Sequence, residues 1–293
     1  MAAHLDPPPR ARTVLVTDAS QPIGRATALR LADSGDWVLA CAPDRASMRD
    51  LARETAAGGL IETWPLDLGD ETSCRGALAH ADAIFGRLDA VVHAAITAHF
   101  SAVEETDSDT LEAVFASNFF GAHRLLKLAI PAFRARRRGH LICVTSVAGR
   151  VALPLSALLS ASHHALEGLL DALRLELRGF GIDVSMIEPG VVRRGVVADT
   201  AGRVERAIAT MAPDSPYGQV ARALAEALED VSADAASPQD VADVVAKALS
   251  AKAPKARYPV TRRTAAWLWA RRLLPTRVLD RRIAKALGLP DDE

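Results

Sequence analysis

Short apolar runs alternate with longer amphipathic segments along the chain from residue 13 onward. The runs predict buried β-strands, and the segments between them, in which apolar residues recur at helical spacing, predict α-helices. Strands that are apolar throughout and are separated by helices indicate a parallel sheet with helices on both faces. The expected strands cover residues 13–17, 37–41, 61–67, 88–94, 140–146, 182–188 and 256–260. The expected helices lie near residues 24–34, 45–56, 71–86, 108–138, 155–180, 218–230 and 238–250.

The order of these elements predicts an α/β fold, a doubly wound Rossmann-type parallel sheet of about seven strands. Three segments are expected: a flexible tail at 1–12, a single domain at 13–260, and a basic amphipathic helical C-terminal extension at 261–293. Ligands of such sheets bind beyond the carboxyl ends of the strands, where the strand order reverses. The loops that follow the strands are therefore the places to search for chemistry.

Composition narrows the class of protein. The chain has 293 residues, of which 49% are hydrophobic, and this excludes a mainly disordered or collagen-like chain. A formal net charge of −1 gives no reason to expect nucleic-acid binding. Three scattered cysteines predict neither disulfides nor a metal site. Because no secretory signal or long apolar run is present, we expect a soluble, cytoplasmic protein.

The loop after the first strand reads Thr17-Asp18-Ala19-Ser20-Gln21-Pro22-Ile23-Gly24 and leads into a helix. It resembles the nucleotide loop of the short-chain dehydrogenase/reductase family, T-G-x-x-x-G-I-G, with Asp18 and Pro22 in place of the first two glycines. Those glycines let the backbone approach a pyrophosphate at the helix N-terminus. A carboxylate at one position and a proline at the other weaken that contact, so a loop that no longer holds a dinucleotide is the competing interpretation.

The resemblance implies NAD(P) as the cofactor, with weak or vestigial binding. Asp67 matches the acidic residue that the family places beside the adenine, and it could equally cap the helix that starts near Glu71. Asp44 and Arg45 leave the choice between NAD and NADP open, and they could also be a helix cap and first turn. The candidate cofactor-binding residues are Thr17, Ser20, Ile23, Gly24 and Asp67.

The resemblance is strongest over residues 139–190. Ser146 stands at the family's catalytic serine, and Asn118 stands at its helix asparagine. The family's catalytic tyrosine and lysine are replaced by Leu159 and His163. In the family the tyrosine delivers a proton, and the lysine lowers the tyrosine's pKa and holds the nicotinamide ribose. Leu159 has no exchangeable proton, so the sequence predicts a degenerate redox site in a non-redox, regulatory or repurposed family member.

Two alternatives stay open. The chain could remain an NAD(P)-dependent oxidoreductase for a lipophilic alcohol or ketone, with Tyr217 as a displaced acid. Alternatively, Ser146 and His163 could carry out chemistry without a cofactor, with Glu167 one helical turn from the histidine as its orienting group.

The resemblance also implies a dimer, a homodimer or a heterodimer, through the long helices near 108–138 and 155–180. The second of these is apolar on more than one side, which favours burial by a partner. The segment 261–287 is basic and amphipathic. It could cover a pocket for a lipophilic small molecule or lie on an anionic membrane as a peripheral contact.

Overall fold

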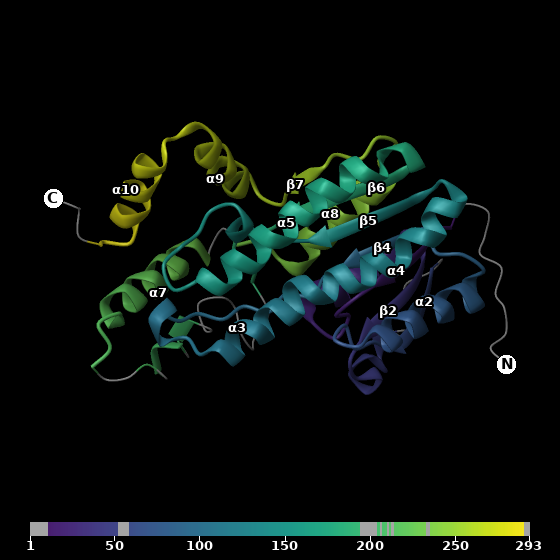
Figure 1. Ribbon diagram of the computed structural model, residues 1–293, viewed down its shortest axis with the longest axis horizontal. Helices are drawn as coiled ribbons and strands as arrows, with labels where there is room; N and C mark the ends of the chain where they lie inside the picture. The colour runs from purple at the N-terminus through teal and green to yellow at the C-terminus, as the bar shows by residue number, and fades with distance from the viewer. Residues whose placement is uncertain are drawn as a thin grey trace.

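The computed structural model describes residues 11–51, 59–193, 204–205, 207–209, 211, 214–232 and 235–289. In this part of the chain seven strands form one parallel sheet in the order β3-β2-β1-β4-β5-β6-β7 (Figure 1). This is the doubly wound arrangement that the sequence predicts. The strands are β1 (Thr13–Val16), β2 (Trp37–Ala42), β3 (Leu60–Pro65), β4 (Ala90–His93), β5 (Gly139–Val144), β6 (Ile182–Glu188) and β7 (Arg257–Pro259).

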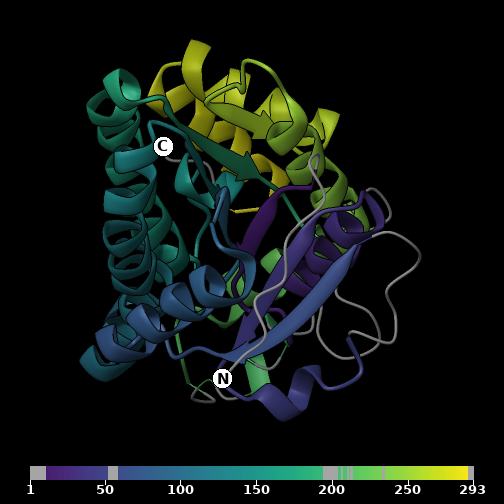
Figure 2. The same ribbon diagram turned by 90° about the vertical axis from the view of Figure 1, so that its right-hand side faces the viewer.

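Helices cover both faces of the sheet (Figure 2). On one face, α1 (Pro22–Asp33) and α8 (Pro238–Ser250) bury their apolar residues against the strands. On the other, α2 (Glu71–Phe85), α4 (Gly121–Arg136) and α5 (Ala157–Leu177) form a second core. Since both faces are buried, the central strands have no polar face.

The remaining helices extend beyond one end of the sheet (Figure 1). A third apolar cluster joins α7 (Gly218–Ser232), α9 (Arg262–Leu273) and α10 (Thr276–Ala286) to the loops there. The other described elements are α3 (Ser108–Phe115), the π-helical turn η4 (Ala116–Phe120) and the 3-10 turns η1 (Arg45–Met48), η3 (Val103–Glu105), η5 (Val147–Gly149) and η6 (Arg178–Phe180).

Two expected helices differ from the prediction. The helix expected near 45–56 appears as η1, and residues 52–58 lie outside the described part. Asp44 caps this turn by accepting a hydrogen bond from the backbone N–H of Ala46 at 2.8 Å. The helix expected over 108–138 is divided by η4, a π-turn of the kind found inside helices at functional sites.

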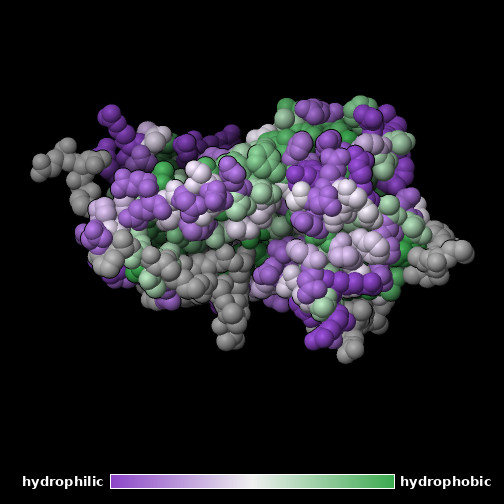
Figure 3. Space-filling model, turned by 60° about the horizontal axis from the view of Figure 1, so that its bottom comes forward, coloured by the Kyte–Doolittle hydropathy of each residue, from purple (hydrophilic) through white to green (hydrophobic). Residues whose placement is uncertain are grey.

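The two ends of the chain are only partly described. Residues 1–10 of the expected tail and 290–293 of the extension lie outside the described residues. Arg12, which was assigned to the tail, forms an ion pair with the buried Asp36 at 2.8 Å. No described helix is both long and apolar enough to cross a membrane. The face in Figure 3 is mostly hydrophilic, and hydrophobic side chains reach its surface in limited areas.

Gly24 fixes the packing of α1 against the first loop. A Cβ at this position would lie 2.4 Å from the carbonyl oxygen of Asp18, closer than real Cβ atoms approach backbone. We therefore expect Gly24→Ala to lower the free energy of unfolding by about 1–3 kcal/mol, because helix or loop must shift. Chemical denaturation would measure the change.

Gly76→Ala, in the middle of α2, is the matched control, because a Cβ there meets no atom within 4 Å. This control should leave stability unchanged or raise it by about 0.5–1 kcal/mol through helix propensity. Equal effects of the two substitutions would contradict the packing role of Gly24.

Candidate functional site

The strand order reverses beside β1, because β1 pairs with both β2 and β4. Two hollows open at the carboxyl edge of this region. We call the first the serine pocket, an apolar cavity of about 120 Å³ that contains Ser146 and Leu159. We call the second the loop cleft, a cavity of about 600 Å³ that borders Thr17, Asp18 and Asp67. Ile96 lines both, so the two hollows adjoin.

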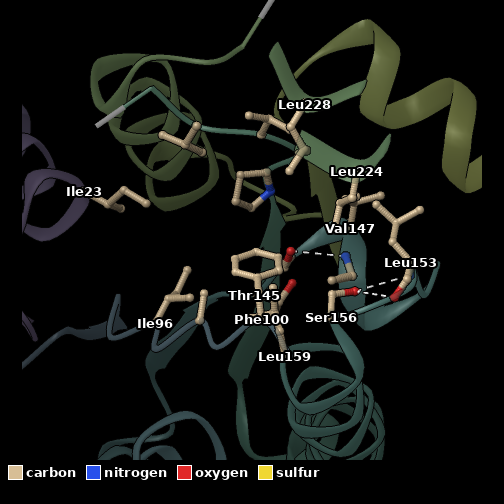
Figure 4. A pocket seen from close by; sticks show the side chains of 17 residues that line it. Ile23, Ile96, Phe100, Thr145, Val147, Leu153, Ser156, Leu159, Leu224 and Leu228 are labelled. Carbon is tan, nitrogen blue, oxygen red and sulfur yellow. Dashed lines mark hydrogen bonds between the residues drawn. The ribbon is translucent and has the colours of Figure 1, made fainter. Parts of the chain in front are cut away.

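The serine pocket brings together two of the four predicted catalytic positions, Ser146 and Leu159. Figure 4 shows Leu159 in its wall. Ser146 follows β5 and caps η5, where its Oγ accepts a hydrogen bond from the backbone N–H of Ala148 at 3.1 Å. Leu159 comes from the first turns of α5. The remaining wall is mostly aliphatic or aromatic, so the site presents three hydroxyl residues, Thr145, Ser146 and Ser156, among apolar groups. Its apolar lining includes Ile23, Ile96, Phe100, Val147, Leu153, Leu224 and Leu228.

The loop cleft is lined by the first loop and by the loops after β3 and β4. Asp18 lies in this lining in the left-handed region, with φ of 55°, a conformation that favours glycine. Pro22 is the first residue of α1, so the helix begins without a backbone N–H at that residue. The half-exposed Ser20 belongs to the same loop. The loop thus leads from β1 into α1, as the resemblance implies, with a carboxylate residue at position 18 and no backbone N–H at position 22.

Asp67 lies in the loop cleft, and its role there stays a prediction. Its Oδ1 accepts a hydrogen bond from the backbone N–H of Gly69 at 2.7 Å. The cap of α2 is Asp70, which accepts from the backbone N–H groups of Thr72 and Ser73. The alternative interpretation of Asp67 as the helix cap is therefore wrong.

Thr17 ties β1 to β4 beneath the loop cleft. Its Oγ1 accepts a hydrogen bond from the backbone N–H of Ala94 at 2.9 Å and lies 3.5 Å from Nδ1 of His93. Both side chains are fully buried, and Nε2 of His93 has no hydrogen-bond partner among the described residues. The motifs singled out in the sequence do not include His93, which the structure places in the core beside Thr17.

Asn118 is fully buried in η4. Its Oδ1 accepts from the backbone N–H of Thr97 at 2.7 Å, and its Nδ2 donates to the Thr97 carbonyl at 2.8 Å and to Oγ of Ser162 at 3.0 Å. The amide therefore anchors the loop after β4 to the helices behind it. These three hydrogen bonds of the Asn118 amide all go to protein groups, so they give the residue a structural role.

His163 has no exposed surface, and neither ring nitrogen has a hydrogen-bond partner among the described residues. Burial lowers its pKa to about 4, and the neighbouring His164 acts in the same direction. Burial, assisted by His163, likewise lowers the pKa of His93 to about 4. At neutral pH both imidazoles are therefore uncharged, and the position at which the family carries a lysine holds no cation.

The predicted Ser146–His163–Glu167 arrangement is not assembled. Because both ring nitrogens of His163 lack partners, no hydrogen bond joins the histidine to either of the others. Glu167 instead accepts from Thr145 Oγ1 at 3.3 Å and from Arg257 at 2.5 Å. Arg257, which the sequence did not single out, also donates to Glu188 at 2.8 Å. Burial raises the pKa of Glu167 to about 7 against the opposing effect of Arg257.

Tyr217 lies just before α7 and does not line either hollow in the described part of the chain. A hydrogen bond to Glu104 raises the pKa of its phenol. A raised pKa favours the protonated phenol, and Tyr217 is absent from the described lining of the serine pocket.

Comparisons with known proteins agree with this architecture. A family model described as short chain dehydrogenase matches residues 12–203. The uncharacterized oxidoreductase YbbO of Escherichia coli K12 is 32% identical over 278 residues, which cover 92% of this chain and 93% of that protein. A short-chain dehydrogenase structure from Streptomyces avermitilis has 26% identity, a TM-score of 0.77 and 96% coverage of both chains. A metagenomic short-chain oxidoreductase in complex with NADP has 27% identity and a TM-score of 0.65, over 85% of this chain and 96% of that chain.

The lowered pKa values of three buried histidines determine how the free energy of unfolding should depend on pH. Burial lowers the pKa values of His93, His140 and His163 from 6.5 to about 4. Below pH 6.5 the unfolded chain takes up protons that the folded chain does not accept until about pH 4, so stability falls across this window as pH falls. For each histidine the loss between pH 6.5 and 5 is about 1.5 kcal/mol. Chemical denaturation at several pH values would measure it.

His163→Leu should reduce this pH dependence by about one histidine's share, about 1.5 kcal/mol, without reducing stability at pH 7. His123→Gln is the control, because His123 is exposed on α4. An unchanged pH profile in His163→Leu would mean that the imidazole is charged or solvated in the folded protein.

Proposed function

We infer the function of this chain from its family, because the chain belongs to the short-chain dehydrogenase/reductase family. We propose that it is a member without the family's hydride-transfer activity, which binds a lipophilic small molecule in the serine pocket. The observation that carries the proposal is the pairing of Leu159 in the pocket wall with a buried, uncharged His163 beneath it.

Reduction of a carbonyl builds negative charge on its oxygen, which a positioned acid must neutralise. Ser146 and Leu159 both line the pocket, and of these two side chains only the serine carries an exchangeable proton. An unperturbed serine is a poor proton donor near neutral pH. Loss of general acid catalysis alone lowers a rate by about 10²–10⁴.

The residues present do not fit a nicotinamide dinucleotide as the family binds it. The loop cleft is roomy, but Asp18 places a carboxylate in its lining near the helix N-terminus where a pyrophosphate would bind. Pro22 removes a backbone donor from the first turn. His163 has no exposed atom that could reach a ribose hydroxyl. We therefore assign no catalytic step to NAD(P).

A second apolar cavity of about 240 Å³ adjoins the serine pocket and extends the space available to a ligand. The two share Val147, Leu153 and Leu224 in their walls. The second cavity continues toward Trp267 on α9 and Leu287 after α10. A cavity pair with such walls suits an elongated, mostly apolar molecule, with Ser146 as a polar contact at one end.

The two alternatives have less support. An oxidoreductase that uses Tyr217 as its acid needs a phenol in the pocket, whereas Tyr217 lines neither hollow among the described residues. Chemistry by Ser146 and His163 needs a hydrogen bond between them, and the described ring nitrogens make none.

Activity and binding assays together test the proposal. The wild-type protein should show no substrate-dependent change in NADPH or NADH absorbance over a panel of lipophilic ketones. It should bind anilinonaphthalenesulfonate with enhanced fluorescence, and Leu153→Gln should weaken that binding about tenfold, because it places an amide in the wall of both cavities.

Leu78→Gln is the matched control, because Leu78 is also a half-buried leucine but packs in the core on the α2 side of the sheet. It should leave probe binding unchanged. Brisk coenzyme turnover, or equal loss of binding in both variants, would overturn the proposal.

We also propose that the long helices form a dimer interface, as the family resemblance implies. α5 packs against α3 and η4, so these elements form one layer. Large apolar side chains are exposed on this layer: Phe120 is 50% exposed and Leu175 is 65% exposed. Exposed apolar groups of this size on one layer favour a protein partner.

Sedimentation should show a dimer for the wild-type chain, and Phe120→Glu with Leu175→Glu should shift it to monomer. Introducing unpaired charges at an interface costs at least about 2 kcal/mol of association free energy. Val103→Glu is the control, because Val103 is 69% exposed on η3, outside the long helices. A dimer that survives the double substitution would place the interface elsewhere.

A further inference from the structure

The outer face of α9 carries two large apolar side chains in solvent. Trp269 is 58% exposed and Leu273 is 70% exposed. They are four residues apart, so they lie one above the other on the same side of the helix. Arg272 lies over the Trp269 ring, with its guanidinium carbon 5.6 Å from the ring centroid. An indole and a leucine beside a guanidinium form an amphipathic surface that nothing in the described chain covers.

The charge around this surface is strongly one-sided. Between Arg262 and Ala286 the cations outnumber the acids by eight to one, and Asp280 is the single acid. All eight cations are exposed, although Arg263 also lines the second cavity. They are Arg262, Arg263, Arg271, Arg272, Arg277, Arg281, Arg282 and Lys285. The chain as a whole has a formal charge of −1, so this local excess is a property of the helix pair and not of the protein.

The opposite face of the helix pair is fixed to the domain. Leu279 and Ile283 of α10 are buried in the third apolar cluster, and Trp267 of α9 packs against it. One apolar side of the helix pair therefore packs against the domain, and the opposite side faces solvent. Figure 1 shows α9 and α10 at the edge of the molecule, and Trp269 and Leu273 are exposed on their outer side.

We propose that the outer face of α9 and α10, which we call the basic face, docks on an anionic lipid bilayer. Trp269 and Leu273 enter the interfacial layer of the bilayer, and the surrounding arginines bind lipid phosphates and carboxylates. Arginine is suited to this contact because its guanidinium donates two parallel hydrogen bonds to a phosphate. The proposal does not depend on the ligand proposed above.

Charge alone would also suit a nucleic acid, but the exposed apolar pair favours the bilayer. A double helix offers a polyanionic backbone to cations and no apolar layer that would bury Leu273. A membrane interface accepts both components, since indole rings settle at the headgroup level while cations attract anionic lipids.

Sedimentation of the full-length protein with vesicles tests the proposal. Binding to vesicles of phosphatidylcholine with phosphatidylserine should exceed binding to pure phosphatidylcholine by at least about tenfold and should weaken as salt rises. Trp269→Ser with Leu273→Ser should lower vesicle binding by about tenfold or more. Arg262→Glu with Arg272→Glu should abolish the preference for the anionic lipid.

Matched controls distinguish vesicle binding by the basic face from nonspecific binding by other exposed apolar or basic residues. Val103→Ser removes an equally exposed apolar side chain, and Arg134→Glu with Arg138→Glu reverses two exposed cations on and just after α4. Both should bind vesicles as the wild type does, and thermal unfolding should verify that every variant is folded. The proposal is overturned if the wild type shows no lipid preference, if the controls lose binding equally, or if duplex DNA binds tightly and without dependence on Trp269.

Discussion

Burial of the sheet on both faces is the constraint from which the rest of the molecule follows. The strands β1, β2, β4 and β5 are apolar along most of their length, and helices rich in alanine and leucine cover the sheet on both faces. Such a sheet can meet a ligand only at its carboxyl edge, where the loops leave the core. Both hollows of the site lie there, and their walls come from loops and helix starts rather than from the strands.

The same burial determines the chemistry at that edge. A lysine can extend its ammonium to the surface of a pocket, whereas the shorter His163 remains beneath the wall and loses its charge by desolvation. His93 is buried next to it and is uncharged for the same reason. Arg257 forms ion pairs with both Glu167 and Glu188, which opposes the effect of burial on the Glu167 carboxylate. The polar groups near the pocket thus serve the structure, and Ser146 is left as the accessible hydroxyl of the predicted catalytic positions.

Strand positions could be predicted from the sequence because buried parallel strands are nearly continuous apolar runs, and β6 at Ile182–Glu188 begins and ends as expected. The capping role considered for Asp44 was also confirmed, since it depends on a local hydrogen bond. The division of the long helix at η4 could not be predicted, because no sequence pattern marks the π-turn and the bonds of Asn118 within it go to Thr97 in another loop. The burial of His163 was likewise invisible, since a helical pattern does not reveal how deeply a polar residue lies. The second cavity depends on how α9 and α10 fold back, which is a tertiary property.

The helix pair α9 and α10 shows how one short sequence can meet two apolar environments. Its inner residues complete the cluster that encloses the second cavity, and its outer residues place an indole and a leucine among arginines. Unless another surface covers Trp269 and Leu273, these exposed side chains leave apolar area in contact with water, which has a free-energy cost. Arginine side chains lower that cost only in part, by stacking on the indole. Contact with a bilayer interface would remove this free-energy cost more fully. Docking there would also bring the wall of the lipophilic cavity close to the source of lipophilic molecules. The two proposals therefore rest on opposite faces of the same helices, and either can hold without the other.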